Sequence, residues 1–517
     1  MTGPPRPRRN PYWTIPALLI MLSMPLQWSI ALFAAVVAAR AGVALARPAL
    51  ARRALRRDAS ARAETLALGT DQQGHPVTLQ ERQLAAHGLI VGASGAGKST
   101  TLLGILTEQI IRGRPVIAID LKGSPAFSRR LRSAGAAAGR PVRIWTPDGP
   151  EAWNPLAVGN ATELKDKLIA TERFTEPHYQ RAAERYVQTA LQALHADGRD
   201  ADLPSVVALM DPRRLSVLAR SLQPAMADRI QDYLGSLTRD QLSAIRGFGT
   251  RLALLSEGTA GPFLSGMPGH RSAGVLEPLT HGARPGPVLA APIDLRRALA
   301  GEEIVVFSLN SGRYGQLAAQ LGTLAIQDLV SATGHRLQSM AGGHAPPLAT
   351  IAVDEFSAVG SDQVLALLAR GREAGVSVLL ATQELSDLER AGRGFRDQVL
   401  GLTSLKIAHR QDVPASARTF AEMAGSEQVW EETHTIGSWL GAGQRSRGTR
   451  RAVSRLVVHP DEIARLPTGE AVMLSKTPVS SVTRVRVNPA PQPAAPTRAA
   501  PRRPAPPPRD QDPGVTR

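Results

Sequence analysis

Cysteine is absent from the 517-residue sequence. Its absence excludes disulfides, thiolate zinc sites and cysteine-ligated clusters, although it says little about the cellular compartment. The 11 histidines form no H-E-x-x-H pair, so we expect ordinary surface or core histidines rather than a metal site. The sequence also shows no internal repeat and no recognisable winged-helix module near the C-terminus.

Negative charge is in short supply relative to positive charge. The sequence has 61 Lys and Arg against 44 Asp and Glu, a formal net charge of +17. Such an excess suits a polyanionic partner, either nucleic acid or an anionic membrane face. Heavy use of Arg, Ala, Gly and Pro, as a GC-rich coding bias produces, explains the charge equally well. The length allows two or three domains, and 43% hydrophobic residues supply a sizeable core.

An uncharged apolar run, residues 15–39, stands out near the N-terminus. It is long enough to cross a bilayer as a helix, and Pro25 and Gln27 predict a kink within it. A cleaved signal peptide has a shorter apolar region, so we favour a retained membrane anchor. A tight two-span hairpin broken at Pro25 is the alternative. The larger arginine cluster follows the run, which places the remaining chain in the cytoplasm, at the inner face of the cell membrane.

The most informative stretch is a glycine loop that follows the apolar run 89–91 and precedes a helix-like segment, 101–111. Strand, glycine loop and helix together predict a phosphate-binding loop, whose N–H groups and helix dipole favour phosphate oxygens. We expect Lys98 to reach the β- and γ-phosphates of ATP and the Ser99 hydroxyl to ligate Mg²⁺. The predicted nucleotide-binding residues are Gly92, Ala93, Ser94, Gly95, Ala96, Gly97, Lys98, Ser99 and Thr100.

Short apolar runs alternate with amphipathic stretches through the rest of the chain. Four of these runs, 116–120, 304–309, 348–354 and 376–382, are apolar along nearly their whole length. Strands covered by helices on both faces have such continuous apolar sequences, so the pattern predicts an α/β fold with a mainly parallel sheet.

One region, about 163–257, interrupts the alternation with helical periodicity and little strand signal. Tyr179, Ala183, Tyr186, Ala190 and Leu194 are expected on one helix face. The predicted organisation is a membrane anchor and basic linker over 1–60, a first part of the nucleotide-binding domain over 61–160, an all-α insertion over 161–260, a second part over 261–487, and a disordered Pro- and Arg-rich tail over 488–517.

A second half of the nucleotide site follows the apolar run 348–354. Asp354 ends this strand and is expected to hold Mg²⁺. Glu355 is expected to polarise the attacking water. Gln383, after the next strand, is placed to sense the γ-phosphate, although a Gln capping the following helix would look the same. Arg372 is the candidate for an arginine that reaches a neighbouring subunit's site, with Arg370 as substitute and a surface salt bridge as the alternative.

Six segments of the chain, taken in order, resemble those of type IV coupling proteins. They are IVGASGAGKST, VIAIDLKGSP, WNPL, LATIAVDEFSAVG, LLARGREAGVSVLLATQELSDL and VVHPDEIARLPTGEAVML. These are the conjugative DNA-transfer ATPases of the VirD4/TraG/TraD type, P-loop motors related to the FtsK and HerA proteins. The resemblance covers about 89–474. The Walker segments are shared by many ATPases, whereas Asp-Leu-Lys-Gly, Asn-Pro-Leu and Asp-Glu-Phe in sequence are more specific.

The resemblance implies a RecA-like motor at the inner membrane, working as a homo-hexamer with DNA in its channel. It implies delivery of DNA with its relaxase to a transfer channel. Candidate DNA contacts are Arg393, Arg396 and the arginine cluster within 445–455. The N-terminus leaves no room for the two spans and small periplasmic part that the better-known members commonly have. A double-stranded DNA pump of the FtsK or HerA type, or an ATP-switched membrane receptor for protein cargo, are the alternatives.

Overall fold

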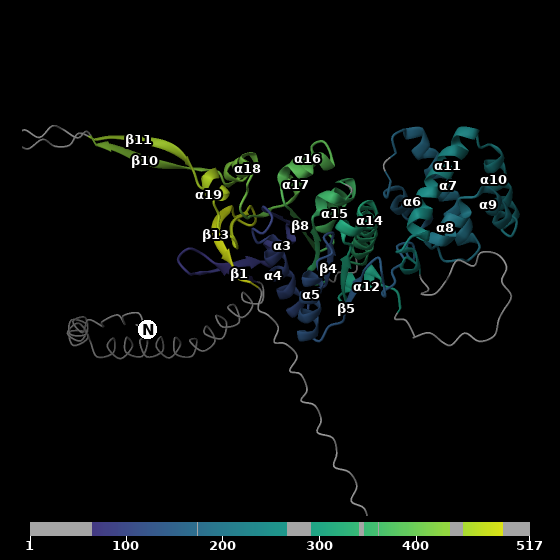
Figure 1. Ribbon diagram of the computed structural model, residues 1–517, viewed down its shortest axis with the longest axis horizontal. Coiled ribbons are helices and arrows are strands. Elements are labelled where there is room, and N and C mark those ends of the chain that lie inside the picture. The colour runs from purple at the N-terminus through teal and green to yellow at the C-terminus, as the bar shows by residue number, and fades with distance from the viewer. Residues whose placement is uncertain are drawn as a thin grey trace, which may run out of the picture. The chain divides into compact units, whose positions relative to one another are not determined.

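The computed structural model describes residues 65–172, 174–265, 291–340, 346–359, 361–434 and 448–489. From Ala67 onward these residues belong to one compact unit. A sheet of eleven strands lies at its centre (Figure 1), in the order β2-β1-β13-β12-β9-β3-β8-β7-β4-β6-β5. The predicted run at 15–39 and nearly all of the predicted tail lie outside the described residues. Within the described ranges, no helix is both long and apolar enough for a bilayer crossing.

Seven neighbouring strands of this sheet run parallel to one another. They are β9 (Leu405–Ala408), β3 (Gly88–Val91), β8 (Val376–Thr382), β7 (Ala349–Asp354), β4 (Val116–Asp120), β6 (Ile304–Ser308) and β5 (Val142–Trp145). Strands β3, β4, β7, β8 and β9 are buried along their whole length, as expected where helices cover both faces. The α/β prediction with a mainly parallel sheet is therefore confirmed.

Four further strands extend the sheet beyond β9. They are β12 (Glu470–Ser475), β13 (Ser481–Val487), β1 (Thr65–Thr70) and β2 (Pro76–Gln80). β12 pairs antiparallel with β9 and with β13, and β13 pairs antiparallel with β1. This extension brings the last described strand, β13, beside the first, β1, and places β12 beside β9.

Helices connect the strands of the sheet. They are α3 (Glu81–Ala85), α4 (Lys98–Ile111), α5 (Pro125–Ala137), α12 (Leu295–Ala300), α13 (Ser311–Tyr314), α14 (Gln316–Ser339), α15 (Ser361–Gly371), α16 (Leu385–Ala391), α17 (Phe395–Leu402), α18 (Pro414–Ala424) and α19 (Pro460–Ala464). Because each parallel strand needs a crossover to reach the next, these helices follow from the strand order.

The chain between β5 and α12 is helical where it is described as far as residue 257 (Figure 1). Its helices are α6 (Ala161–Ile169), α7 (Pro177–Ala196), α8 (Leu203–Leu209), α9 (Pro212–Ala219), α10 (Pro224–Gly235) and α11 (Arg239–Glu257). Four of the five residues expected on the inner face of α7 are fully buried, namely Ala183, Tyr186, Ala190 and Leu194. Tyr179 is 39% exposed, so the buried part of this face begins at Ala183. Tyr179 lies in the first turn of α7.

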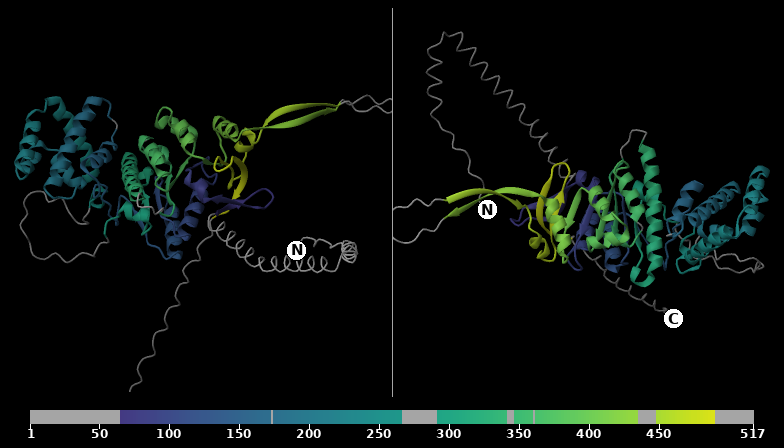
Figure 2. Two further views of the ribbon diagram at one scale, coloured as in Figure 1. Left: turned by 180° about the vertical axis from the view of Figure 1, so that it is seen from behind. Right: turned by 90° about the horizontal axis from the view of Figure 1, so that it is seen from above.

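Two strands stand apart from the large sheet. β10 (Ser426–His434) and β11 (Gly448–Leu456) pair antiparallel as a two-stranded ribbon, seen from two further sides in Figure 2. The described part of β11 carries three of the arginines that we considered as DNA contacts, whereas Arg445 lies outside the described residues.

Candidate nucleotide-binding site

The glycine loop adopts the shape that a phosphate-binding loop requires. β3 ends at Val91 and α4 begins at Lys98, with residues 92–97 between them. Gly95 and Gly97 have φ angles of 74° and 122°, a region that side chains disfavour. At Gly92 a Cβ would lie 2.6 Å from the Cβ of His409, so the loop passes too close for any larger residue. The loop thus directs the N-terminal N–H groups of α4 toward a bound anion.

Lys98 is buried and folds back on its own loop. Its Nζ donates to the carbonyl oxygens of Gly92 at 2.6 Å and Ala93 at 3.4 Å. Burial lowers the pKa of Lys98, and the nearby Lys122 ammonium lowers it further. Two ammonium groups therefore converge on one pocket, which is lined by residues of the loop, by Lys122 and by the segments around Gly469 and Val487. Such a pocket suits a polyphosphate.

Ser99 and Asp354 meet although they are far apart in sequence. The Ser99 Oγ donates to Asp354 Oδ2 at 3.2 Å. Asp354 ends β7 beside Asp120, which ends β4 in the same register. Burial raises the pKa of Asp354, although Lys122 and the Ser99 hydroxyl oppose that shift. A bound cation acts in the same direction as Lys122, since it favours the ionised carboxylate.

The residues present fit a magnesium ion. Asp354 Oδ1 is buried and has no hydrogen-bond partner in the described part of the chain. Hydroxyl and carboxylate oxygens are the ligands that Mg²⁺ prefers beside a nucleotide phosphate. Ser99 and Asp354 would hold the ion, which supplies positive charge to the phosphate oxygens when it is bound.

Glu355 lies next to Asp354 in a strained conformation. Its φ of 59° is in the left-handed region, which a residue with a side chain occupies at a cost of roughly 1–2 kcal/mol. Its Oε1 accepts from Gln383 Nε2 at 3.0 Å and lies 2.5 Å from Lys122 Nζ. Strain of this kind persists where surrounding contacts impose it, often at functional sites. The structure thus brings Glu355 and Gln383 together and adds Lys122, to which the sequence analysis assigned no role.

Asp120 supports the segment that carries Lys122. Its carboxylate accepts from the backbone N–H groups of Lys122, Gly123 and Ser124 at 3.0, 3.1 and 2.6 Å. Burial raises the pKa of Asp120 to about 6, with the Asp354 carboxylate contributing and the three N–H groups opposing. The available signal was an acid at the carboxyl end of a predicted strand, followed two residues later by a lysine.

His409 is a second residue that the sequence analysis missed. Its ring lies against the glycine loop, with Nδ1 donating to the Glu470 carbonyl at 2.9 Å. Its Nε2 therefore accepts from the Thr101 hydroxyl, also at 2.9 Å. Burial lowers the pKa of His409 to about 4, so the ring is neutral at physiological pH. The Gly469 N–H, which donates to Ala96 O at 2.9 Å, supports the same loop from β12.

Arg370 and Arg372 lie away from this site within one chain. Both are exposed, at the end of α15 and just before β8 begins at Val376. Gln383 follows the other end of β8, so the strand separates them by roughly 20 Å at 3.3 Å per residue. Only a second copy of the chain can bring either arginine to this cleft, and the role of Arg372 remains a prediction.

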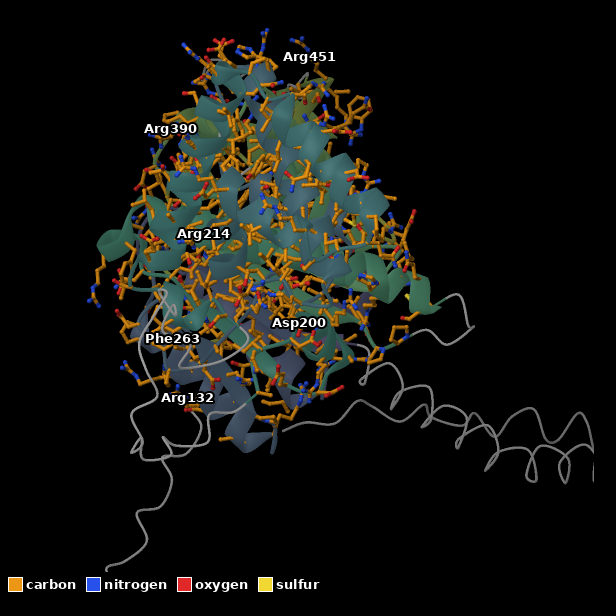
Figure 3. All side chains as sticks on the ribbon, turned by 90° about the vertical axis from the view of Figure 1, so that its right-hand side faces the viewer. Arg132, Asp200, Arg214, Phe263, Arg390 and Arg451 are labelled. Atoms are coloured by element: carbon orange, nitrogen blue, oxygen red, sulfur yellow. The ribbon has the colours of Figure 1, made fainter. Side chains whose placement is uncertain are left out.

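The candidate DNA-contact arginines lie on charged surface elements. Arg396 pairs with Asp397 at 3.0 Å and with Glu389, while Arg393 is exposed between α16 and α17. Figure 3 shows Arg390 of α16 and Arg451 of β11 at the surface. In the ribbon, the arginines of β11 face glutamates of β10: Glu427 opposite Arg455, Glu431 opposite Arg451 and Glu432 opposite Arg450. The described part of the ribbon is thus charge-balanced.

Two segments of the chain match known protein families. Residues 349–468 match the family model described as the TraM recognition site of TraD and TraG. Residues 49–123, which include the glycine loop, match the FtsK/SpoIIIE family. No curated protein sequence matches the chain.

Solved structures of the bacterial conjugative coupling protein TrwB have a similar fold. The unbound form gives a TM-score of 0.55 at 13% identity, over 82% of this chain and 89% of TrwB. The TrwB complex with ADP and Mg²⁺ gives 0.53 at 14% identity, over 82% and 89% of the two chains. The TrwB complex with a non-hydrolysable ATP analogue gives 0.53 at 14% identity, over 83% and 90%.

The similarity to TrwB establishes the fold, and the two family models match the glycine loop and the segment from β7 to the end of α19. Both agree with the resemblance that the motifs indicated. The chain thus combines a TrwB-like fold with one segment that matches the FtsK/SpoIIIE family and another that matches the TraM recognition site of TraD and TraG.

Proposed function

We propose that this protein is a membrane-anchored, ATP-hydrolysing DNA translocase that acts as a conjugative coupling protein. The observation that carries the proposal is that the glycine loop meets the polar residues that end β7 and follow β8. Lys98 and Ser99 line one pocket, Ser99 donates to Asp354, and Glu355 accepts a hydrogen bond from Gln383. The TraG/TraD segment match and the TrwB-like fold support the assignment to conjugation.

Each residue of the cleft has a defined part in the proposed reaction. The loop N–H groups and Lys98 bind the phosphates, and Ser99 with Asp354 holds the magnesium ion. Glu355 accepts a proton from the attacking water, and Gln383 fixes the Glu355 carboxylate by its hydrogen bond. Hydrolysis then changes the contacts at the carboxyl ends of β7 and β8, from which the surface segments with α16 and α17 begin.

A homo-hexamer at the inner membrane completes the proposal. Arg372 is too far from its own cleft, and an adjacent subunit would supply it to the developing charge on the phosphate. The apolar run 15–39 would anchor the motor with its ATPase domain in the cytoplasm. The relaxase bound to the transferred DNA and the transfer-channel proteins are the proposed protein partners.

We expect DNA binding to be salt-sensitive and largely independent of base sequence, since a motor grips phosphates. Arg393 is the better candidate contact, because no hydrogen bond or ion pair is found for its side chain in the described residues. The described β11 arginines are weaker candidates, because glutamates of β10 lie opposite them.

The decisive experiment measures ATP hydrolysis by the purified full-length protein with and without DNA. We expect DNA to stimulate turnover, Glu355→Gln to abolish turnover while retaining nucleotide binding, and Lys98→Ala to weaken binding itself. Lys476→Ala, a change at an exposed lysine on the other edge of the sheet, is the matched control. Hydrolysis that ignores DNA would favour the ATP-switched receptor, and an unimpaired Lys98→Ala variant would refute the site assignment.

A double-stranded DNA pump of the FtsK or HerA type is the remaining alternative. The match to the TraG/TraD segment over residues 349–468 favours the coupling protein. The helical stretch α6 to α11 that follows Trp153-Asn154-Pro155-Leu156 favours it as well. Transfer of a plasmid between cells, measured with and without the Lys98→Ala change, separates the two functions.

A further inference from the structure

Lys122 stands at the reacting end of the cleft, on a different strand from the glycine loop. It follows β4, two residues after Asp120, whose carboxylate accepts the Lys122 N–H at 3.0 Å. The side chain lines the same pocket as Lys98, Ser99 and Thr100. Its Nζ lies 2.5 Å from Glu355 Oε1, the same oxygen that accepts from Gln383. Lys122 therefore lies beside the two residues to which the proposed function assigns the attacking water.

The cleft holds two lysines, and both contact oxygen atoms of the protein. Lys98 Nζ donates to the Gly92 carbonyl at 2.6 Å, and Lys122 pairs with the Glu355 carboxylate. The two ammonium groups are close enough that Lys122 lowers the pKa of Lys98. Burial lowers the pKa of Lys122 itself, but its hydrogen bond to Glu355 and the carboxylates of Asp354 and Asp120 raise it by more. Both lysine side chains line one pocket, which therefore suits a highly charged anion.

We propose that Lys122 recognises the terminal phosphate of a nucleoside triphosphate and exchanges its ion pair with Glu355 for that phosphate. This inference rests on the proposed function and assigns a specificity-determining residue to the same site. With the triphosphate absent, or with a diphosphate bound, Lys122 stays on Glu355. With a triphosphate bound, Lys122 moves to the phosphate, which leaves the Glu355 carboxylate free to accept a proton from water. Through this exchange, the Glu355 carboxylate is freed from Lys122 only when a hydrolysable triphosphate is bound.

The backbone around both partners is built to hold the two side chains together. Three N–H groups bind the Asp120 carboxylate and fix the segment from Lys122 to Ser124. Glu355 adopts its left-handed conformation at φ 59° in the arrangement where it meets Lys122 and Gln383. A surface ion pair without a function would not need a strained partner, since such pairs contribute little to stability.

The first test compares affinities for two nucleotides in the presence of Mg²⁺. The full-length protein is titrated with ADP and with a non-hydrolysable ATP analogue, and binding is measured by calorimetry. We expect Lys122→Ala to weaken binding of the analogue by about 10- to 100-fold, the loss of one hydrogen bond between charged groups. Binding of ADP should change by less than about twofold, which also shows that the variant is folded. Lys122→Arg should restore part of the preference, and Lys476→Ala should change neither affinity.

The second test uses the competition between Glu355 and the phosphate for Lys122. Glu355→Gln removes the competing carboxylate, so we expect it to tighten binding of the ATP analogue by at least about threefold. In the Lys122→Ala background the same change should have no effect on that affinity. The coupling is compared between the two nucleotides, because residues in contact couple whatever their role. The exchange predicts coupling in the affinity for the ATP analogue and none in the affinity for ADP, whereas a purely structural role predicts the same coupling for both.

The outcomes distinguish failure of the Lys122 inference from failure of the proposed function. Three results would overturn the inference and leave the proposed function standing. Lys122→Ala could lose affinity for ADP and for the ATP analogue equally, or lose affinity for neither. Alternatively, Glu355→Gln could tighten binding of the analogue as much in the Lys122→Ala background as in wild type. A wild-type protein that binds neither nucleotide would overturn the proposed function.

Discussion

A buried ion pair joins the helical stretch to the motor, and breaking it is the prediction for which the structure gives the clearest magnitude. Lys167 of α6 is 2% exposed at its side chain and pairs with Asp328 of α14 at 2.8 Å. Its Nζ also donates to the carbonyls of Pro155 at 2.9 Å and Val158 at 3.0 Å. Asp328 accepts a second hydrogen bond from the Trp153 indole at 2.9 Å. Three segments of the chain, α6, α14 and residues 153–158, therefore meet at one ammonium and one carboxylate.

Lys167→Met keeps the length of the side chain but removes all three hydrogen bonds. It leaves Asp328 with the Trp153 indole as its one remaining donor among the described residues. Removing one partner of a buried pair costs about 3–5 kcal/mol. Burial raises the pKa of Asp328, and the Lys167 charge opposes that shift. Without Lys167 the pKa rises further, so the cost is full above that pKa and shrinks as the pH falls and the carboxyl group takes up a proton.

Hydrogen exchange of the backbone amides in α6 measures this cost locally, and urea unfolding measures it globally. We expect faster exchange in α6 for Lys167→Met and a smaller deficit at pH 5 than at pH 8. Lys165→Met, which removes a lysine paired with its neighbour Asp166 on the same helix, should stay within about 0.5 kcal/mol of wild type. The double change Lys167→Met with Asp328→Leu should cost less than the sum of its parts.

Two outcomes would refute this reasoning. One is a Lys167→Met protein within about 1 kcal/mol of wild type, since a buried unpaired carboxylate costs more than that. The other is strict additivity in the double variant, which would show that Lys167 and Asp328 do not act as a pair.

Three further predictions concern the cleft. Gly92→Ala should weaken nucleotide binding at least about tenfold and cost roughly 1–3 kcal/mol, because the new Cβ would lie 2.6 Å from the Cβ of His409. Gly104→Ala in α4, where an added Cβ meets nothing within 4 Å, should be neutral or slightly stabilising in the same calorimetric and unfolding assays. His409→Gln should reduce the loss of stability, about 3 kcal/mol by linkage, that wild type suffers between pH 6.5 and 4. Arg372→Ala should lower kcat by on the order of 10³-fold, and mixing it with Lys98→Ala should restore hydrolysis, because the inactive partner supplies the arginine.

The sign of the His409 prediction follows from its lowered pKa. The unfolded ring takes up a proton near its ordinary value of 6.5, whereas the buried ring resists protonation until about pH 4. Stability from the neutral ring is therefore present above pH 6.5 and lost as the pH falls through this window. The His409 prediction is contradicted if the stability of His409→Gln depends on pH as wild type does. The Gly92 prediction is contradicted if Gly92→Ala binds nucleotide tightly. The Arg372 prediction is contradicted if the mixture of Arg372→Ala with Lys98→Ala recovers no hydrolysis.

The sequence predicted the elements of this site whose signal is local. Strand β4 occupies the residues expected for it, 116–120, and β8 those expected at 376–382. Both are apolar runs ended by polar residues, and no tertiary contact is needed to recognise them. The glycine loop was equally clear, because its glycines, its lysine and the flanking strand and helix lie within a few tens of residues.

What the sequence did not predict depends on contacts between distant segments. His409 reaches the glycine loop through the parallel pairing of β9 with β3, which joins residues more than 300 positions apart. Its isolated ring gives no pattern that distinguishes it from the other histidines. Lys122 is equally hidden, since its role depends on β4 lying beside β7 and on the left-handed conformation of Glu355. Strand order, unlike strand position, carries no local signature.

The same strand order explains why the last strands of the chain belong to the nucleotide site. β12 lies beside β9, and the Gly469 N–H that precedes it donates to Ala96 within the glycine loop at 2.9 Å. The Glu470 carbonyl fixes the His409 ring, and Val487 of β13 donates back to the Gly469 carbonyl at 2.8 Å. A nucleotide that moves the loop must therefore also move β12 and β13, or break these bonds. Since the β10–β11 ribbon is joined to β12 through the short helix α19, a change in the loop has a short covalent path to the ribbon.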